Sequence, residues 1–277
     1  MSSPSGLTMP NGKELFRQVT VPDFLSARAR GVRLTMLTAY DYSMARLLDE
    51  GGVDAILVGD SLGMVMQGNN NALSVTLDEM IYHTRCVARG IRRALLIADL
   101  PFMTYQLNAE QALMSAGRLI KEGGAHAVKL EGGLRSVPAV EAIVRADIPV
   151  LGHVGMTPQS VHRFGGFRVQ RDAERLLRDA KAVEEAGAFA IVMECVPAEL
   201  AARITEALSI PTIGIGAGVG CDGQVLVVQD VLGMYSDLHP KFVKQFADVG
   251  NQIRQAVRDY CQEVKEATFP DADTSFH

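Results

Sequence analysis

The sequence lacks the features that mark several classes of protein. It contains no Trp and only four cysteines, and no apolar run reaches the roughly 18 residues that a membrane span requires. No Cys-x-x-Cys pair is present, so the cysteines predict neither a zinc site nor a disulfide framework. The four are Cys86, Cys195, Cys221 and Cys261. We therefore expect a cytoplasmic protein that does not bind a membrane.

An excess of positive charge is also missing. Lys and Arg number 27 against 32 Asp and Glu, which gives a formal net charge of -5. Proteins that bind nucleic acid or anionic membranes do so through cationic surfaces. The first six residues do not combine a basic segment with an apolar core, as a secretory signal would. These absences argue against a nucleic-acid partner and favour a small-molecule partner.

Short apolar segments recur along the chain and alternate with helical patterns. About eight of them are continuously apolar, which is typical of strands buried on both faces of a parallel sheet. Capping residues such as Asp41, Thr76 and Asn108 begin the helices between them. Glu79 follows Thr76 by three residues, which predicts a capping box. The predicted strands span residues 33–40, 54–59, 94–98, 125–133 with its glycine turn, 148–152, 188–193, 211–215 and 224–228.

The length of 277 residues suits a (β/α)8 TIM barrel, an α/β fold of ~250 residues, with additions at both ends. We predict a single barrel domain over residues 1–277, because no linker rich in proline or serine divides the chain. The additions are a short helix over residues 21–31 and a long C-terminal helix from Pro240 to about Glu266. An open doubly wound sheet is the alternative fold.

Ionisable residues end five of the predicted strands, which is where the active site of a barrel lies. Alternate residues of a strand share a face, and each ionisable residue shares its face with apolar residues predicted to point inward. Asp60, for example, shares the face of Ile56 and Val58. A single charged strand end is often only a contact with solvent, but five in one register predict one site. The residues are Asp60, Asp99, Lys129 with Glu131, His153 and Glu194.

Three of these residues form a predicted cluster of carboxylates. Asp60, Asp99 and Glu131 end successive strands, so they are neighbours in a barrel. Carboxylates gathered at the mouth of the barrel, the end where the carboxyl ends of the strands meet, repel one another because the dielectric constant there is low. One of them would bind a proton unless a cation joined them. Hard oxygen ligands without Cys or a second nearby His suit Mg²⁺ better than Zn²⁺. We predict that the three bind Mg²⁺; the alternative is that Lys129 alone neutralises them.

The other residues at the strand ends have predicted roles in binding and proton transfer. Lys129 could form an imine, but nearby carboxylates would keep it protonated, so we expect an ammonium that binds an anionic substrate. His153 is a donor to an oxyanion, a proton shuttle or a core histidine. Glu194 lies two strands beyond the carboxylate cluster, where it stays free as a general base. Ser61 can offer its hydroxyl and N–H to a substrate carboxylate.

A glycine cluster, Gly214–Gly218, overlaps the end of the seventh predicted strand. Many barrels bind phosphate at this position. Close packing of the backbone explains the glycines equally well, so the sequence leaves both interpretations open.

Several motifs, in one order along the chain, resemble the ketopantoate hydroxymethyltransferase family. The likeness runs from about Leu37 to the end of the sequence. A set of separate motifs is more specific than any one of them. The motifs are Thr38–Ser43, Val58–Met64, Ala98–Met103, Val128–Gly133, Gly152–Gln159, Glu194–Pro197, Ile213–Gly218 and Ser275–His277.

The resemblance implies a fold and an activity. Family members are (β/α)8 barrels that transfer a one-carbon unit from 5,10-methylenetetrahydrofolate to 3-methyl-2-oxobutanoate, giving 2-dehydropantoate in pantothenate biosynthesis. They are cytoplasmic and commonly assemble as decamers. Carried over motif by motif, the resemblance implies Mg²⁺ ligands at Asp60, Asp99 and Glu131, oxo-acid contacts at Asp60, Ser61, Asp99, Lys129 and His153, and a proton acceptor at Glu194.

Two other functions fit the same residues. One is a metal-dependent aldolase or lyase that acts on a related 2-oxo acid without folate. The other is a barrel kept as a binding scaffold without catalysis, which is disfavoured because every proposed catalytic position is occupied by a reactive residue.

Overall fold

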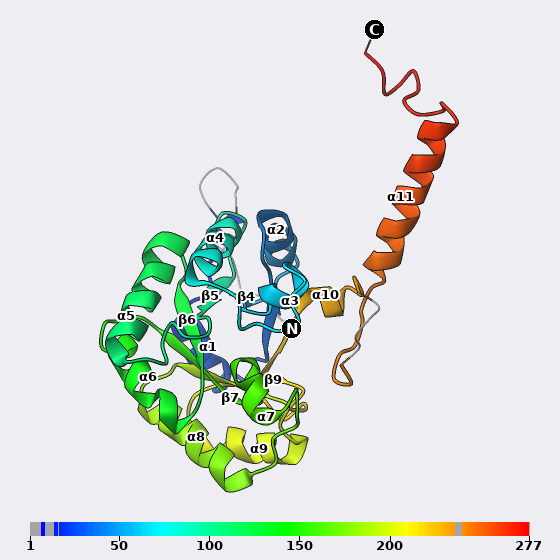
Figure 1. Cartoon of the computed structure of the whole chain (residues 1–277). Coiled ribbons are helices and arrows are strands. Elements are labelled where there is room, and N and C mark those ends of the chain that lie inside the picture. The colour runs from blue at the N-terminus through cyan, green and yellow to red at the C-terminus, as the bar shows by residue number, and fades with distance from the viewer. Residues whose placement is uncertain (1–6, 9–13, 16, 236–239, 277) are drawn as a thin grey trace. The chain divides into compact units, whose positions relative to one another are not determined.

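The computed structural model describes residues 7–8, 14–15, 17–235 and 240–276. The first six residues and the last residue of the terminal motif, His277, lie outside the described residues. Eight parallel strands close into a barrel, with β10 pairing with β3 (Figure 1). The predicted (β/α)8 barrel is therefore confirmed, and the alternative prediction of an open doubly wound sheet is wrong. The strands are β3 (Leu34–Thr38), β4 (Ala55–Val58), β5 (Leu95–Asp99), β6 (Ala127–Glu131), β7 (Val150–Gly155), β8 (Ala190–Glu194), β9 (Thr212–Ile215) and β10 (Gly223–Leu226).

Helices surround the barrel and begin where the capping residues predict (Figure 1). Asp41 and Asn108 accept the N–H groups of the first turns that follow them. Thr76 and Glu79 form the predicted capping box at the start of α4, which satisfies two otherwise unpaired N–H groups. The helices are α1 (Val21–Ala27), α2 (Tyr42–Glu50), α4 (Leu77–Ala88), α5 (Ala109–Arg118) with its π-helical extension η1 (Leu119–Gly123), α6 (Val137–Val144), α8 (Ala173–Glu185) and α9 (Ala198–Ala207).

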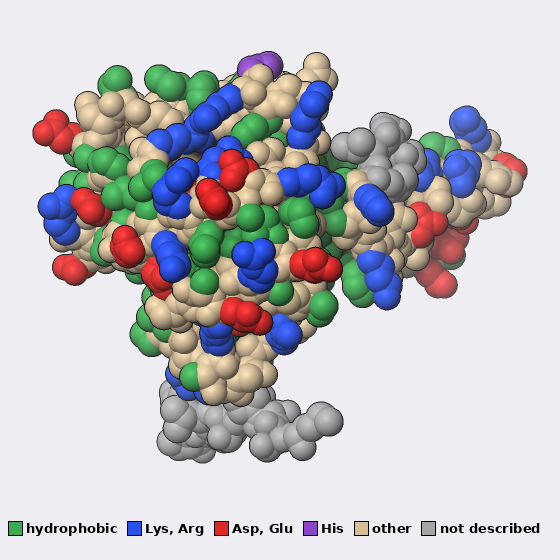
Figure 2. Space-filling view, turned by 90° about the horizontal axis from the view of Figure 1, so that it is seen from below, with side chains coloured by type: hydrophobic (Ala, Val, Ile, Leu, Met, Phe, Trp, Pro, Cys, Tyr) green, Lys and Arg blue, Asp and Glu red, His purple; other side chains and the backbone are tan. Residues whose placement is uncertain are grey.

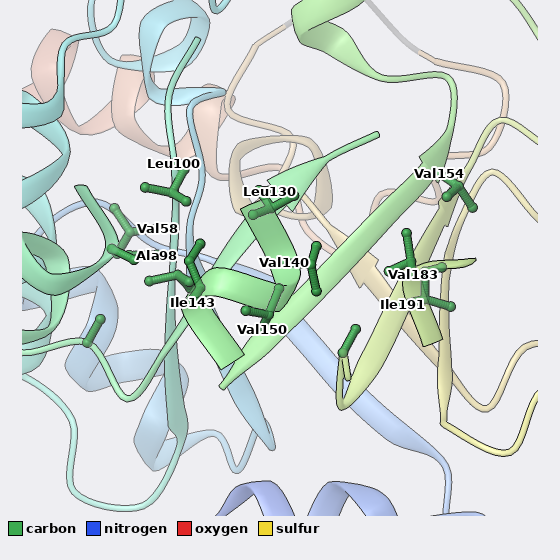
Figure 3. Close-up of a cluster of buried hydrophobic side chains, with 14 of the residues drawn as sticks. Val58, Ala98, Leu100, Leu130, Val140, Ile143, Val150, Val154, Val183 and Ile191 are labelled. Carbon is green, nitrogen blue, oxygen red and sulfur yellow. The ribbon is translucent and has the colours of Figure 1, made fainter. Parts of the chain in front are cut away.

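Two apolar layers hold the barrel together. One layer fills its interior with side chains from all eight strands, and Phe24 of α1 joins it, with its ring 6.0 Å from that of Phe189 in an edge-on contact. The other layer lies between strands and helices, where Val58, Leu130 and Ile191 pack toward the helices (Figure 3). Burying one such side chain contributes about 1.5–3 kcal/mol. Strands β4 to β8 are therefore apolar on both faces, which explains their continuous apolar runs in the sequence.

The two layers correct one predicted strand face. On β4 the interior residues are Ala55 and Leu57, whereas Ile56 and Val58 lie in the outer layer. The prediction that Asp60 shares an inward face with Ile56 and Val58 was therefore wrong. The strand ends at Val58, and Asp60 enters the mouth from the turn that follows rather than from the strand.

For the other four strands the predicted inward face is confirmed. The residues that precede Asp99, Lys129, His153 and Glu194 on the same faces lie in the interior layer. They are Leu95 and Ile97 on β5, Ala127 on β6, Leu151 on β7, and Ala190 and Val192 on β8.

Short elements occupy segments that follow the predicted strands. A helix of four residues, α3 (Leu62–Val65), begins directly after Ser61. The segment after β7 contains a 3-10 turn, η3 (Pro158–Ser160), and α7 (Val161–Phe164). Periodicity cannot reveal a helix of a single turn. The remaining elements are the hairpin β1 (Leu7–Thr8) and β2 (Glu14–Leu15), and η2 (Leu134–Ser136).

Close packing accounts for the glycine cluster at the end of β9. A Cβ on Gly218 would lie 2.4 Å from the Cβ of Ala198, and a Cβ on Gly214 would lie 2.9 Å from the Sγ of Cys221. Real Cβ atoms do not approach other atoms so closely, so these positions require glycine for packing. The structure thus supports the packing interpretation of Gly214–Gly218.

Residues 227–277 form a second compact unit, which contains α10 (Val228–Val231) and α11 (Val249–Lys265). The prediction that the long helix begins at Pro240 was wrong, although its end is confirmed. Phe246 and Val249 donate their N–H groups to the carbonyls of Val231 and Leu232, at 2.8 and 2.9 Å. Because the N–H of Phe246 pairs with Val231 of α10 and not with Phe242, as it would inside a helix, the long helix begins only at Val249. A single domain over residues 1–277 stays a prediction.

No described helix is long and apolar enough to cross a membrane. The face of the molecule in Figure 2 carries acidic side chains as well as basic ones. This mixture of charges agrees with the small negative net charge of the sequence.

Candidate active site

The predicted residues meet at the carboxyl ends of the strands. Asp99 and Glu194 are the last residues of β5 and β8, Lys129 and Glu131 belong to the end of β6, and His153 lies in β7. Asp60 and Ser61 form the turn between β4 and α3. Burial is nearly complete for five of the seven, whose exposed fractions are 2–5%. These five are Asp60, Asp99, Lys129, Glu131 and His153.

An ion pair lies at the centre of the site. The Nζ of Lys129 is 2.6 Å from the Oδ1 of Asp99, and both side chains are buried. Asp99 uses its other oxygen, Oδ2, to accept the backbone N–H of Asp60 at 3.0 Å. Burial alone would lower the pKa of Lys129, but the charges of Asp99, Glu131 and Asp60 outweigh it and raise that pKa. Lys129 is therefore an ammonium.

The three carboxylates repel one another, as the sequence predicts. Burial, followed by the charges of Asp99 and Glu131, raises the pKa of Asp60 well above its ordinary value, and the ammonium of Lys129 offsets only part of this. A carboxylate whose charged form is disfavoured gains strongly from a nearby cation. The site therefore favours a bound cation in addition to Lys129.

His153 lies between two glutamates. Its Nδ1 is 3.6 Å from the Oε1 of Glu131, and its Nε2 is 3.3 Å from the Oε2 of Glu194. Burial alone would lower the pKa of His153, but the two carboxylates outweigh it and raise the pKa to about 9. Among the described residues, neither ring nitrogen makes a well-formed hydrogen bond. Buried polar atoms of this kind are normally paired, so they are candidates for contact with a bound molecule.

Ser61 and Gly59 complete the turn that follows β4. The Oγ of Ser61 lies 2.8 Å from the hydroxyl of Tyr40, and either group can be the donor. Burial raises the pKa of Tyr40, so its hydroxyl stays protonated. A Cβ on Gly59 would lie 2.8 Å from the Oγ of Ser61 and 3.5 Å from the Oδ2 of Asp99. Gly59 thus leaves room for both site residues.

The sequence did not single out Gln159, which lies at the centre of the hydrogen bonds around the carboxylates. Its side-chain Nε2 donates to Asp60 Oδ2 at 2.8 Å, and its backbone N–H donates to Glu131 Oε2 at 3.0 Å. It is 7% exposed and belongs to η3. The available signal was its place at the end of the motif Gly152–Gln159, since loop residues gave no strand register to follow.

The carboxylates fit a magnesium ion by their chemistry. Among the described residues, no three His, Cys, Asp or Glu side chains are arranged as a ready-made metal cluster. The oxygen Oε1 of Glu131 is buried and has no hydrogen-bond partner among the described residues. This oxygen lies 3.6 Å from His153 Nδ1, and together with the raised pKa of Asp60 it offers an anionic donor to a cation. Asp60, Asp99 and Glu131 offer the hard oxygen donors that Mg²⁺ prefers.

Solved structures share the barrel. Phosphonopyruvate hydrolase in complex with oxalate and Mg²⁺ matches with a TM-score of 0.61 at 14% identity, over 92% of this chain and 93% of that one. 2,3-Dimethylmalate lyase, a member of the PEP mutase/isocitrate lyase superfamily, matches with a TM-score of 0.60 at 17% identity, over 92% and 91%. At these identities the likeness concerns the fold alone.

Sequence relatives are much closer. The family model described as ketopantoate hydroxymethyltransferase matches residues 18–272. The 3-methyl-2-oxobutanoate hydroxymethyltransferase of Clostridium novyi (strain NT) is 59% identical over 261 residues, which cover 93% of this chain and 95% of that protein. The enzyme of the same name from Syntrophus aciditrophicus (strain SB) is 56% identical over 264 residues, covering 94% and 97%. The chain belongs to the ketopantoate hydroxymethyltransferase family.

Proposed function

We propose that this chain transfers a hydroxymethyl group from 5,10-methylenetetrahydrofolate to 3-methyl-2-oxobutanoate and so makes 2-dehydropantoate for pantothenate biosynthesis. Membership of the family supports the activity. The observation that carries the proposed chemistry is the buried group of three carboxylates and one ammonium at the barrel mouth, with Glu194 near by.

Lys129 and Ser61 bind the oxo acid in this proposal. The substrate is an anion, and the buried ammonium of Lys129 supplies the opposite charge. The hydroxyl of Ser61, held against Tyr40, offers a hydrogen bond to a substrate carboxylate. His153 faces the substrate between Glu131 and Glu194 and donates a hydrogen bond to its oxygens. Together these groups fix the orientation of a small 2-oxo acid.

Asp60, Asp99 and Glu131 would hold Mg²⁺. When bound, the ion would act as a Lewis acid that draws electron density from the keto oxygen of the oxo acid. The protein's own contribution is to keep three acidic side chains buried and close together. Asp99 has a further role, because it also fixes the ammonium of Lys129 beside the substrate.

Glu194 acts as the general base. Its side chain is 13% exposed, and its charged neighbour is His153. No contact between described residues joins Glu194 to Asp60, Asp99 or Glu131 directly. Glu194 takes the proton from C3 of the oxo acid as the C3–H bond breaks. The electron pair of that bond forms the new carbon–carbon bond to the methylene carbon of the folate, and water supplies the hydroxyl on that carbon. Both carbon–nitrogen bonds that hold the methylene carbon break, and tetrahydrofolate leaves with the proton from C3 on one nitrogen and a proton from water on the other. A positioned base of this kind contributes about 10²–10⁴-fold to a rate.

The decisive experiment is an assay of the purified protein with 3-methyl-2-oxobutanoate and 5,10-methylenetetrahydrofolate, with and without EDTA. We expect 2-dehydropantoate with both substrates, and loss of turnover in EDTA that added Mg²⁺ restores. Product from free formaldehyde with no need for folate would favour the aldolase or lyase. Turnover that is insensitive to EDTA would contradict the metal role, and no turnover at all would favour the binding scaffold.

We also propose the cytoplasmic decamer that the family resemblance implies. The mass of the protein in solution, measured by light scattering, tests the assembly. A mass close to the 29.9 kDa of one chain would contradict it.

A further inference from the structure

Gln159 is the one fully hydrogen-bonded amide in the described part of the carboxylate site. Its Nε2 donates both protons, one to Asp60 Oδ2 at 2.8 Å and one to the carbonyl of Leu100 at 2.9 Å. Its Oε1 accepts from the hydroxyl of Tyr105 at 2.7 Å and from Gln106 at 2.9 Å. An amide has two donors and two acceptor positions, so the side chain has no hydrogen-bonding capacity left.

These partners fix the direction of the amide. The reverse orientation would place Oε1 against the carbonyl oxygen of Leu100, two acceptors without a proton between them. It would also place the NH₂ group against the donor of Gln106. The amide therefore always presents N–H to Asp60.

The loop that carries Gln159 is itself held in place. Ser160, the next residue, accepts hydrogen bonds from Arg135 at 2.8 Å and from Thr157 at 2.9 Å. Tyr105 contacts both Gln159 and the backbone of Glu131. The position of Gln159 is thus set by groups on two other loops, Tyr105 after β5 and Arg135 after β6, and not by Asp60 alone.

As a result, Gln159 binds one specific oxygen of each of two carboxylates. Gln159 binds Asp60 Oδ2 through its side chain and Glu131 Oε2 through its backbone N–H. Glu131 Oε1 is left without a hydrogen-bond partner among the described residues. Because the amide is neutral, it holds these oxygens without cancelling the negative charge of the carboxylates. A Lys or Arg at this position would cancel part of that charge. The other oxygens, Asp60 Oδ1 and Glu131 Oε1, are not bound by Gln159, and Glu131 Oε1 lies 3.6 Å from His153 Nδ1.

We infer that Gln159 is a positioning residue that orients Asp60 and, through its loop, Glu131 for a divalent cation. The inference rests on the proposed function, because it takes these carboxylates as the Mg²⁺ ligands. Partners that orient a metal's ligands typically change metal affinity about 10- to 100-fold when they are removed. Gln159 does not touch the substrate in this account.

The test is the Mg²⁺ affinity of the full chain without substrate, measured by isothermal titration calorimetry. Gln159→Met keeps the length of the side chain and removes both donors. We expect its Kd for Mg²⁺ to rise about 10- to 100-fold. Gln159→Asn is shorter by one methylene and cannot reach Asp60 and Tyr105 together. It should also raise the Kd for Mg²⁺, with a smaller loss of folding stability than Gln159→Met.

A matched control separates positioning from loss of stability. The hydroxyl of Thr205 is also buried and bonded, to the carbonyl of Ala201 at 2.9 Å and to Thr212 at 2.7 Å, but at the opposite end of the barrel. Thr205→Val should lower the urea midpoint and leave the Kd for Mg²⁺ unchanged. An unchanged Kd in both Gln159 variants, or an equal rise in Thr205→Val, would overturn the inference. If the wild-type chain bound no Mg²⁺, the proposed metal site itself would fall, and the inference with it.

Discussion

At the scale of single residues, Lys129 shows how neighbours decide chemistry. An imine requires a neutral amine, but the buried carboxylate of Asp99 lies 2.6 Å from Nζ and keeps the lysine charged. The same pair makes the ammonium a fixed positive point for an anionic substrate. The structure therefore favours the binding role, which the sequence also predicts, over the imine.

We predict that Lys129 forms no covalent intermediate. Borohydride added with the oxo acid should leave the protein mass unchanged in mass spectrometry. Lys129→Ala should mainly raise the KM for the oxo acid, because an anionic substrate loses its counter-ion. A stable adduct on Lys129 in wild type would contradict the assignment.

Gly59 must lack a side chain because the hydroxyl of Ser61 lies next to it. The Cβ of Gly59→Ala would lie 2.8 Å from Ser61 Oγ, so that hydroxyl must move. Overpacking typically costs about 1–3 kcal/mol, and we expect kcat/KM to fall by about tenfold or more. Gly117→Ala is the control, since nothing lies within 4 Å of its added Cβ. Equal activity in both variants would show that Ser61 tolerates displacement.

At the scale of elements, the sequence predicted what depends on local rules. Continuous apolar runs located all eight strands, and Thr76 with Glu79 located the start of α4. The beginning of α11 was wrong because the backbone near Phe246 pairs with α10, a contact that no local pattern reveals. Asp60 was found although its predicted strand face was wrong, because the turn after β4 returns it to the mouth.

Gln159 marks the limit of prediction from strand register. Register identifies residues on strands, and the site also depends on a turn held by Tyr105 and Arg135 from other loops. Contacts between loops follow from the closed fold, which a single sequence does not specify residue by residue.

The capping box of α4 gives a prediction about stability. Thr76→Ala removes the hydroxyl that accepts the N–H of Glu79, and N-cap losses of this kind cost about 0.5–2 kcal/mol. Urea unfolding should show this loss, with kcat unaltered because Thr76 lies outside the carboxylate site. Glu79→Gln should be close to wild type, since its amide oxygen can still accept from the Thr76 N–H. A variant Thr76→Ala as stable as wild type would argue that the box is not formed in solution.

At the scale of the whole molecule, barrel closure creates the site. Residues that are far apart in the sequence, from Asp60 to Glu194, meet only when the strands are in register. Acidic side chains outnumber basic ones at the mouth, where Asp60, Asp99, Glu131 and Glu194 lie with Lys129 and His153. A site of this kind can hold a cation and an anionic substrate together while one carboxylate remains a base.

The central claim is that Glu194 removes the proton from C3 of the oxo acid. The most direct measurement is exchange of that hydrogen with D₂O, followed by NMR with Mg²⁺ and without folate. Glu194→Gln keeps the shape of the side chain and loses its basicity, and Glu199→Gln alters an exposed glutamate of α9 as a control. We expect Glu194→Gln to bind Mg²⁺ and the oxo acid but to lose about 10²–10⁴-fold in exchange rate, while Glu199→Gln exchanges like wild type. Exchange at the wild-type rate in Glu194→Gln would contradict the claim and make His153 the next candidate for the base.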